Sequence, residues 1–339
     1  MAVKAGALRF NTDSNKLELY DGNQWTQIVA TSPEAQTGGA RGVIAGAVLQ
    51  SPGTNKVVDI QYITVSTTGN SIDFGDLTQA INAPAGAASR TRATFAGGSA
   101  VPARQTRIEE VTIASTGDAT NFGDLNTNRA ESGGVSNGTR AIIAGGSGGS
   151  PVVDLSVIDY YDISSGGTAN QFGELSDARE RVSGNIMNST RGIFYGGQSP
   201  AVNLIEFVTM STLGNAADFG DLAESSINYS GASNSIRGII QGGDTPASND
   251  GLQYITISTL GNTVQFGEIT TAREITSSVS SPTRMVVIGG YSGPSTRYNI
   301  MDYVQIMSTG NAVDFGDLTG TFSVGTSSQG ACSNGHGGL

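Results

Sequence analysis

The sequence predicts an all-β fold, a β-propeller in which repeated four-stranded blades are arranged around an axis. One phrase occurs six times: it reads IEFVTMSTLGNAADFGDL at residues 205–222, and the other copies end at Leu77, Leu125, Leu175, Ile269 and Leu318. A shorter phrase of an arginine, apolar residues and glycine precedes each copy and begins at Arg41, Arg92, Arg140, Arg191, Arg237 and Arg284. The period is about 49 residues, which is typical of propeller repeats rather than of ankyrin or leucine-rich ones.

Composition agrees with a β-rich repeat array and disfavours several other classes. The 339 residues include 48 glycines, and only 14% of them are charged, which is far from a helical or a disordered composition. The net charge is −11, and the only lysines are Lys4, Lys16 and Lys56, so we expect no nucleic-acid ligand. Without a run of 18 apolar residues or an apolar signal core, neither a membrane span nor a signal peptide is expected.

The first 30 residues differ from the repeats and predict a three-stranded β-meander. The runs AGALRFN, KLELY and WTQIV alternate apolar with polar residues, and the turn sequences TDSN and DGNQ separate them. Residues 31–318 then hold six internal repeats, and residues 319–339 are expected to supply closing strands.

Each repeat divides into four strands, A to D, as residues 134–175 illustrate. Strand A is rich in small residues and ends at Asn137, and the dipeptide Asn137-Gly138 predicts a type I′ hairpin turn. Strands B, C and D are expected at 140–144, 155–163 and 168–175. The other predicted A strands are PEAQT (33–37), AGAAS (85–89), GNIMN (184–188), SGASN (230–234), SSVSS (277–281) and SVGTSS (323–328).

Two features of these strands favour blades that pack face to face. Small residues suit innermost strands, because bulky side chains would collide at the axis. In strand C, Ile205 and Phe207 lie on one face and Val208 and Met210 on the other, so both faces are apolar.

The order of these features resembles the kelch repeat. A small strand, an arginine-x-apolar-Gly-Gly phrase, an apolar strand with tyrosine and an aromatic-x-x-Leu phrase follow one another, and three copies continue to an arginine (Arg129, Arg179, Arg273). Phe219 and its counterparts stand where kelch repeats usually have tryptophan. The resemblance covers residues 30–325 and implies a kelch-like propeller.

The number of blades follows from the residues outside the six repeats, which together have almost the length of one more. KLELYDGNQWTQI matches strands C and D, with Leu17, Tyr20 and Trp25 at the apolar, tyrosine and aromatic positions, and residues 323–338 match strands A and B. We therefore favour seven blades, the last one closed by both termini, which leaves no open sheet edge. The alternative is six blades with the N-terminal meander as a separate attachment segment.

The N-terminal stretch carries a second resemblance. RFNT-x-x-x-x-LE-x-YDG-x-x-W looks like the opening of bacteriophage tail-fibre and other virion structural proteins, especially the kelch-like ones of marine phages, and the C-terminal SNGHGGL is similar to that group. The resemblance implies a virion protein, assembled in the host cytoplasm and oligomeric in the particle, with other virion proteins as partners. Tail, fibre and capsid decoration are all compatible with it.

A carboxylate recurs near the end of every repeated phrase. The six are Asp76, Asp124, Glu174, Asp221, Glu268 and Asp317. A cation ring is conceivable, but a group present in every blade is more simply structural. We expect these carboxylates to accept hydrogen bonds from the strand-B arginines or from backbone amides. If Asp221 is buried and paired, Asp221→Asn costs about 1–3 kcal/mol.

Enzymatic chemistry is disfavoured, and no cofactor is expected. Galactose-oxidase-like copper sites, which the kelch resemblance brings to mind, need imidazole ligands, and the only histidine is His336. The single cysteine, Cys332, excludes an internal disulfide framework. A Cys332–His336 nucleophile would stand on a glycine-rich tail that positions neither residue firmly.

The B-to-C loops vary between repeats, whereas the C-to-D turns are nearly uniform. Strand direction alternates, so the B-to-C loops emerge on one face together with the D-to-A connections. Variable loops on a rigid scaffold commonly carry binding function, although neutral drift explains them nearly as well. Since tyrosine and arginine dominate binding hot spots, Arg104, Tyr291, Arg297 and Tyr298 are the candidate binding residues.

These observations lead to ranked hypotheses. The first is a non-enzymatic virion structural protein on the phage tail or fibre. The second is a module whose loop face binds a host-surface glycan or protein, and it is compatible with the first. Capsid decoration is a further alternative, and an enzyme ranks last.

Overall fold

The computed structural model describes residues 3–11, 16–27, 40–49, 56–100, 103–198, 200–244, 247–293 and 295–339. These residues form β-strands, turns and one 3-10 helix, and they contain no α-helix. The all-β prediction is therefore confirmed.

Six antiparallel sheets of four strands make up the main body. From the innermost strand outward, sheet 1 consists of β34 (Gly330–Ser333), β4 (Arg41–Ala45), β6 (Val57–Thr64) and β7 (Ile72–Ile81), and sheet 2 of β8 (Ala85–Ala88), β9 (Arg92–Ala96), β10 (Arg107–Thr112) and β11 (Thr120–Asp124). Sheet 3 consists of β13 (Gly133–Ser136), β14 (Arg140–Ala144), β17 (Val157–Asp162) and β18 (Asn170–Glu174), and sheet 4 of β19 (Ser183–Met187), β20 (Arg191–Tyr195), β21 (Val202–Thr209) and β22 (Ala217–Ser226). Sheet 5 consists of β23 (Tyr229–Ser233), β24 (Arg237–Gly242), β25 (Gly251–Thr256) and β26 (Val264–Glu268), and sheet 6 of β27 (Ser277–Ser280), β28 (Arg284–Ile288), β31 (Ile300–Gln305) and β32 (Val313–Asp317).

Short elements decorate the loops at one end of these sheets. They are β5 (Val48–Leu49), β12 (Arg129–Ala130), β15 (Ser147–Gly148), β16 (Val153–Asp154), β29 (Tyr291–Ser292), β30 (Thr296–Arg297), β33 (Thr326–Ser327) and the 3-10 helix η1 (Gly320–Val324).

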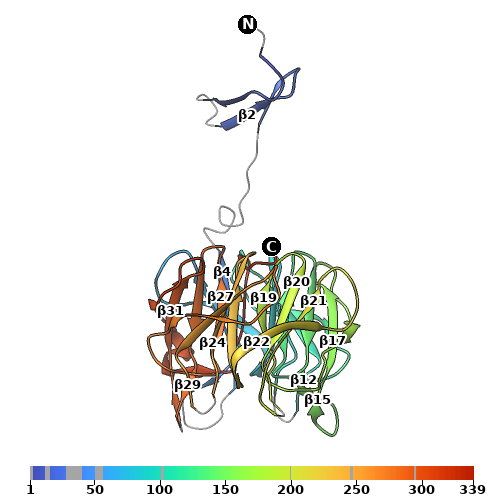
Figure 1. Cartoon of the computed structure of the whole chain (residues 1–339), viewed down its shortest axis with the longest axis vertical. Coiled ribbons are helices and arrows are strands. Elements are labelled where there is room, and N and C mark those ends of the chain that lie inside the picture. The colour runs from blue at the N-terminus through green and yellow to red at the C-terminus, as the bar shows by residue number, and fades with distance from the viewer. Residues whose placement is uncertain are drawn as a thin grey trace.

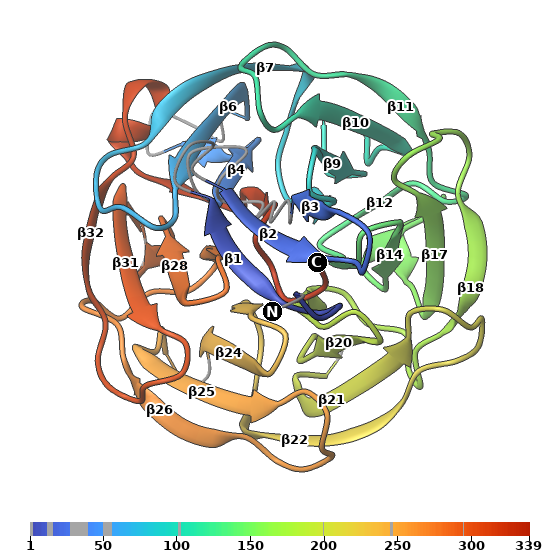
Figure 2. The same ribbon diagram turned by 90° about the horizontal axis from the view of Figure 1, so that it is seen from above.

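The six sheets stand around a central axis, as Figure 2 shows. Their innermost strands contact one another in the cyclic order β8, β13, β19, β23, β27, β34 and back to β8. The arrangement is propeller-like. Its first sheet is completed by the last strand of the chain, because β34 pairs with β4 (Cys332 opposite Val43).

The seven-blade prediction is wrong for the described residues, which contain six four-stranded sheets and no seventh. The C-terminal strand closes sheet 1 instead of meeting the N-terminal strands. The innermost strand is 330–333 rather than the predicted 323–328, which form part of η1 and β33. The predicted strand PEAQT (33–37) lies outside the described residues.

The N-terminal residues form their own three-stranded sheet, as the meander prediction and the six-blade alternative required. It consists of β1 (Leu8–Asn11), β2 (Lys16–Tyr20) and β3 (Trp25–Gln27) in sequential order. Arg9, Tyr20 and Trp25 stack on one face, with the Arg9 guanidinium 4.2 Å from the centre of the Trp25 ring. On the other face Leu8 and Phe10 are 59% and 61% exposed, so this face is apolar and open.

Strand bounds within the repeats match the predictions closely, whereas one turn does not. Strand B of sheet 3 spans the predicted 140–144, and strand A ends one residue before Asn137. Neither Asn137 nor Gly138 has a positive φ, so the type I′ prediction is wrong. Instead, Asn137 Oδ1 accepts the backbone N–H groups of Thr139 and Arg140 and fixes the turn through its side chain.

The core lies between neighbouring sheets. Each of six buried apolar clusters draws residues from two adjacent sheets; one example joins Val43 and Phe74 of sheet 1 to Phe95 and Val111 of sheet 2. Both faces of strand C are buried in this way, as the apolar pattern predicted.

The two ends of the ring differ. The C-terminus lies at one end, which we name the turn face because the A-to-B and C-to-D turns share it, and the short strands β12, β15 and β29 lie at the other, the loop face (Figure 1). The start of β4 also lies at the turn face, since Arg41 N donates to Asn334 Oδ1 of the C-terminal tail (2.8 Å). Ladder pairs such as Glu180 with Gln198 and Glu274 with Tyr291 join D-to-A connections to B-to-C loops there. The predicted segregation of loops and turns is confirmed.

Candidate functional site

The recurrent carboxylates do not form a site. Five are exposed, Asp221 is half-buried, and none forms an ion pair with a strand-B arginine among the described residues. Their own backbone N–H groups are held by the next repeat: Asp221 N donates to Asn262 Oδ1 (3.0 Å) and Asp317 N to Asn70 Oδ1 (3.0 Å). The predicted pairing with the arginines is therefore wrong.

The uniform phrase serves to join neighbouring sheets at the outer edge. Gly117 N of one C-to-D turn donates to Phe74 O of the preceding sheet (2.7 Å), and Gly69 N donates to Phe315 O (2.8 Å), which links the last sheet to the first. A Cβ added at Gly75 would stand 2.5 Å from the carbonyl of Gly117, so only glycine permits this approach. Uniformity here is a structural requirement.

The strand-B arginines also join sheets. Their guanidinium groups stack on an aromatic ring of their own sheet and donate to a carbonyl of the next one. The guanidinium carbon lies 4.6 Å from the ring centre of Tyr160 in Arg140, 4.6 Å from that of Phe207 in Arg191, 4.2 Å from that of Tyr254 in Arg237 and 4.6 Å from that of Tyr303 in Arg284. The hydrogen bonds run from Arg140 to Met210 O (2.7 Å), from Arg191 to Ile257 O (3.0 Å), from Arg237 to Ile306 O (3.1 Å) and from Arg284 to Ser66 O (2.8 Å). Phe219 packs edge-on against Phe207 at 6.3 Å.

A second set of arginines forms buried ion pairs that the sequence reasoning missed. Arg129 Nη2 lies 2.8 Å from Asp159 Oδ2, Arg273 pairs in the same way with Asp302, and Arg179 pairs with Glu206; all six side chains are at most 2% exposed. The signal was the acidic residue in IDY, IEF and MDY, paired with the arginine after strand D. These pairs are structural, since all six side chains are buried and each is paired with its partner.

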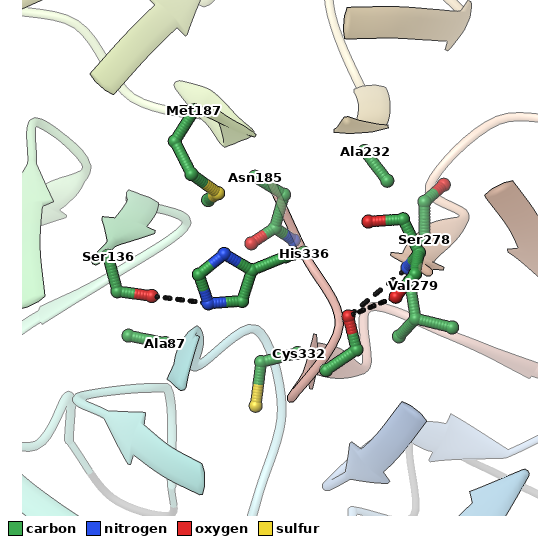
Figure 3. A pocket seen from close by; sticks show the side chains of 11 residues that line it. Ala87, Ser136, Asn185, Met187, Ala232, Ser278, Val279, Cys332 and His336 are labelled. Atoms are coloured by element: carbon green, nitrogen blue, oxygen red, sulfur yellow. Dashed lines mark hydrogen bonds between the residues drawn. The ribbon is translucent and has the colours of Figure 1, made fainter. Parts of the chain in front are cut away.

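The turn-face end of the axis is closed by the C-terminal tail. His336 is buried, its Nδ1 accepts Gly338 N (3.1 Å), and its Nε2 therefore carries the proton toward Ala88 O (2.8 Å). Figure 3 shows His336 facing Ser136 across a small cavity that Cys332 also lines. The tail is thus firmly placed, contrary to the expectation from its glycines.

This arrangement does not activate Cys332. Burial raises the pKa of the thiol to about 12, the opposite of what a nucleophilic cysteine needs. Burial also lowers the pKa of His336 to about 4. The remaining space at this end is about 10 Å³, too small for a substrate.

The predicted binding residues lie on the loop face, at the two ends of an arc of hydrogen bonds, ring contacts and one ion pair. Arg104 Nη2 donates to Ser147 Oγ (2.8 Å) at one end. At the other end Tyr291 pairs with Glu274 through both backbone groups (2.9 Å), and the Arg297 guanidinium lies 5.5 Å from the Tyr291 ring centre. Tyr298 bonds to Ser292 at 2.8 Å.

Between these ends lie three residues that the sequence did not single out. Glu131, Arg181 and Asn228, which we call the rim triad, come from equivalent positions of three successive repeats. Ser147 Oγ donates to Glu131 (3.3 Å), Arg181 Nε lies 3.9 Å from Glu131, and Arg181 Nη1 donates to Asn228 (3.3 Å). Asn228 Nδ2 donates to Glu274 Oε2 (2.6 Å), which completes the arc.

The rim triad belongs to a ring of six residues in the left-handed conformation. Ala83, Glu131, Arg181, Asn228, Ile275 and Ser328 have φ between 51° and 61°. Glu131 N donates to Ala83 O, Ala83 N to Ser328 O and Ser328 N to Ile275 O, so backbone hydrogen bonds join four residues of this strained ring, which we call the girdle. Because all six repeats share it, the girdle itself is structural, whereas its side chains differ.

This ring surrounds a cavity that opens on the loop face. The mouth has a volume of about 250 Å³ and is lined by the rim triad, Tyr229 and Gln329. Below the mouth lies a deeper chamber of about 110 Å³ between the innermost strands, and Ser132 and Thr276 line both. Closed by the tail at the far end, this axial cavity is the candidate binding site.

Glu274, which accepts the Asn228 amide of the rim triad, is an acid with a perturbed pKa beside the site. It is 4% exposed, and burial, together with the neighbouring Asp244, raises its pKa to about 7. Glu274 and Asp244 do not line the axial cavity; they line a separate groove beside Tyr291.

Comparisons with known proteins give no assignment. No family model matches the chain, and no curated protein matches it. Among the described residues no helix is long and apolar enough to cross a membrane, and no cluster of three potential metal ligands occurs.

Proposed function

We propose that the protein is a non-enzymatic structural component of a bacteriophage virion, a kelch-like propeller of six blades carried on the tail or its fibres. The observation that supports this proposal most is the structural difference between the two faces of the ring. Both chain ends of the ring lie on the turn face, while the variable loops and the axial cavity lie on the opposite one (Figure 1). A particle-bound module needs this polarity.

The N-terminal sheet is the attachment element in this proposal. Its open apolar face, with Leu8 and Phe10, suits burial against other virion proteins. Mass spectrometry of purified particles should detect the wild-type protein. The double variant Leu8→Ser, Phe10→Ser should fold but be missing from particles, whereas Val313→Ser, which alters an equally exposed apolar residue of the ring, should be incorporated. Absence of the wild-type protein, or equal incorporation of both variants, would refute the proposal.

The second candidate, compatible with the first, is binding of a host-surface glycan or protein by the loop face. The axial cavity and the arc from Arg104 to Tyr291 favour it. Purified protein added to host cells should then reduce phage adsorption. Unchanged adsorption at saturating protein would favour a purely structural role, including that of a capsid decoration protein.

A further inference from the structure

The axial cavity combines small size, a polar rim and apolar walls. Its mouth of about 250 Å³ lies below the range of about 300–1,000 Å³ that suits drug-sized ligands. A molecule of one ring fills it, and the chamber of about 110 Å³ beneath accepts a short substituent. Because the tail closes the far end, the cavity is blind and recognises the end of a ligand rather than its middle.

The charges at the rim favour an uncharged ligand. Arg181 is partnered by Glu131 at 3.9 Å, so the rim triad is formally neutral. An anionic ligand would compete with Glu131, and a cationic one would meet Arg181. What remains is a set of planar donors and acceptors, two guanidinium or amide groups and a carboxylate, that match adjacent hydroxyl groups.

The walls supply both unsatisfied polar atoms and apolar surface. Ser132 Oγ, Gln329 Oε1 and Arg181 Nε are buried without a hydrogen-bond partner among the described residues. Gln329 is 6% exposed and anchored through Nε2, which donates to Ile288 O at 2.9 Å, so its oxygen is held in place. Val182, Ile275 and the ring of Tyr229 provide apolar surface for C–H groups.

We propose that the axial cavity binds a neutral sugar ring, the terminal residue of a glycan. Buried hydroxyl and amide groups select hydroxyl partners, since a ligand lacking them leaves these atoms unpaired. This inference rests on the proposed loop-face function and specifies its ligand class.

The test uses the full chain and a panel of free monosaccharides, neutral, acidic and amino, measured by ligand-observed NMR and isothermal titration calorimetry. At least one neutral sugar should bind, and Arg181→Ala should weaken its binding at least tenfold. Arg90→Ala, which alters an exposed arginine on the turn face, should leave binding unchanged. Thermal unfolding of both variants establishes that they are folded.

Three results would overturn the inference: no binding by any neutral sugar, preferential binding of acidic or amino sugars, or binding that Arg181→Ala does not affect. Failure here is separable from failure of the proposed function. If wild-type protein blocks adsorption but binds no monosaccharide, the loop face acts on another ligand. If a sugar binds but the protein is absent from particles, the cavity assignment stands and the virion assignment falls.

Discussion

At the scale of residues, one repeat position holds either a buried arginine paired with an acid or an uncharged residue. Three repeats place Arg129, Arg179 and Arg273 against a buried acid. The same position holds Ile81, Ser226 or Phe322 in the other three, where the facing residues are Glu109, Gln253 and Gln61. In two of these repeats a neutral glutamine replaces the acid that the arginine would pair with, so no buried charge lacks a partner. Only Glu109 keeps its charge, and Arg107 lies 3.5 Å away.

Removing one partner of such a pair should therefore cost far more than removing both charges. Arg179→Met leaves Glu206 buried and uncompensated, and we expect a loss of about 3–5 kcal/mol in the free energy of unfolding. The double variant Arg179→Met, Glu206→Gln should recover most of that loss. Denaturant unfolding of the double-mutant cycle measures this, and an additive double variant would contradict it.

The Asp221 side chain, in contrast, contributes little to stability. It is half-buried and forms no ion pair among the described residues, so Asp221→Asn should change the free energy of unfolding by less than about 0.5 kcal/mol. The same unfolding assay decides it. A loss above about 1 kcal/mol would restore the larger role first predicted from the repeated sequence.

Two buried groups, His336 and Glu274, should change the free energy of unfolding in opposite directions as the pH changes between about 4 and 7. His336 has its pKa lowered to about 4, so its contribution is full above the unfolded pKa of 6.5 and declines as pH falls toward 4. Glu274 has its pKa raised to about 7, so its contribution is full below the unfolded pKa of 4.5 and declines as pH rises toward 7. The two slopes offset each other in the wild-type protein.

Glu274→Gln removes one of these two opposing effects, so the pH dependence of stability that is due to His336 should become visible. On going from pH 7 to pH 4.5 the midpoint of thermal unfolding should fall more in this variant than in the wild type. Glu180→Gln, which changes the glutamate at the equivalent position of another repeat, is the control and should follow the wild type. Coincident curves for all three proteins would contradict the assignment.

At the scale of elements, the C-terminal tail replaces a turn. Asn334 Oδ1 accepts Arg41 N at 2.8 Å, as Asn137 accepts Arg140 N in an unbroken repeat. The first sheet is therefore interrupted at its A-to-B turn and rejoined without a covalent bond. The glycines that follow let the tail pass between the innermost strands.

Gly337→Ala should consequently destabilise the ring. Its Cβ would lie well inside van der Waals contact of the backbone oxygens of Asn234 and Met187, and neither can move without disturbing its turn or strand. We expect a loss of about 1–3 kcal/mol. Gly138→Ala, where nothing lies within 4 Å of the added Cβ, is the matched control and should be neutral. Equal unfolding midpoints would show that the tail is not packed as described.

At the scale of the whole molecule, the repeat period predicted the sheets but not their number. Strand spacing, apolar pattern and alternation of direction follow from local sequence, and they correctly separated the loop face from the turn face. The closing blade failed because Tyr20 and Trp25 fit any amphipathic meander as well as they fit strands C and D. The true closing strand, 330–333, consists of small residues with little pattern of their own.

For a related reason, the candidate site was not predictable. Arg104, Tyr291, Arg297 and Tyr298 were predicted because tyrosine and arginine on variable loops suit binding, and they lie on the loop face but do not line the axial cavity. Glu131, Arg181 and Asn228 share a position, six residues after the end of each repeated phrase, but no residue type, so no motif marks them. Their proximity depends on the cyclic order of the sheets.

The measurement that tests the proposed virion role most directly is cryo-electron microscopy of phage particles assembled in the presence of this protein. The account predicts a ring of six blades on the tail or fibre, with the turn face and the N-terminal sheet toward the particle and the axial cavity open to solvent. Particles without such a ring, or with its loop face packed against another virion protein, would contradict it.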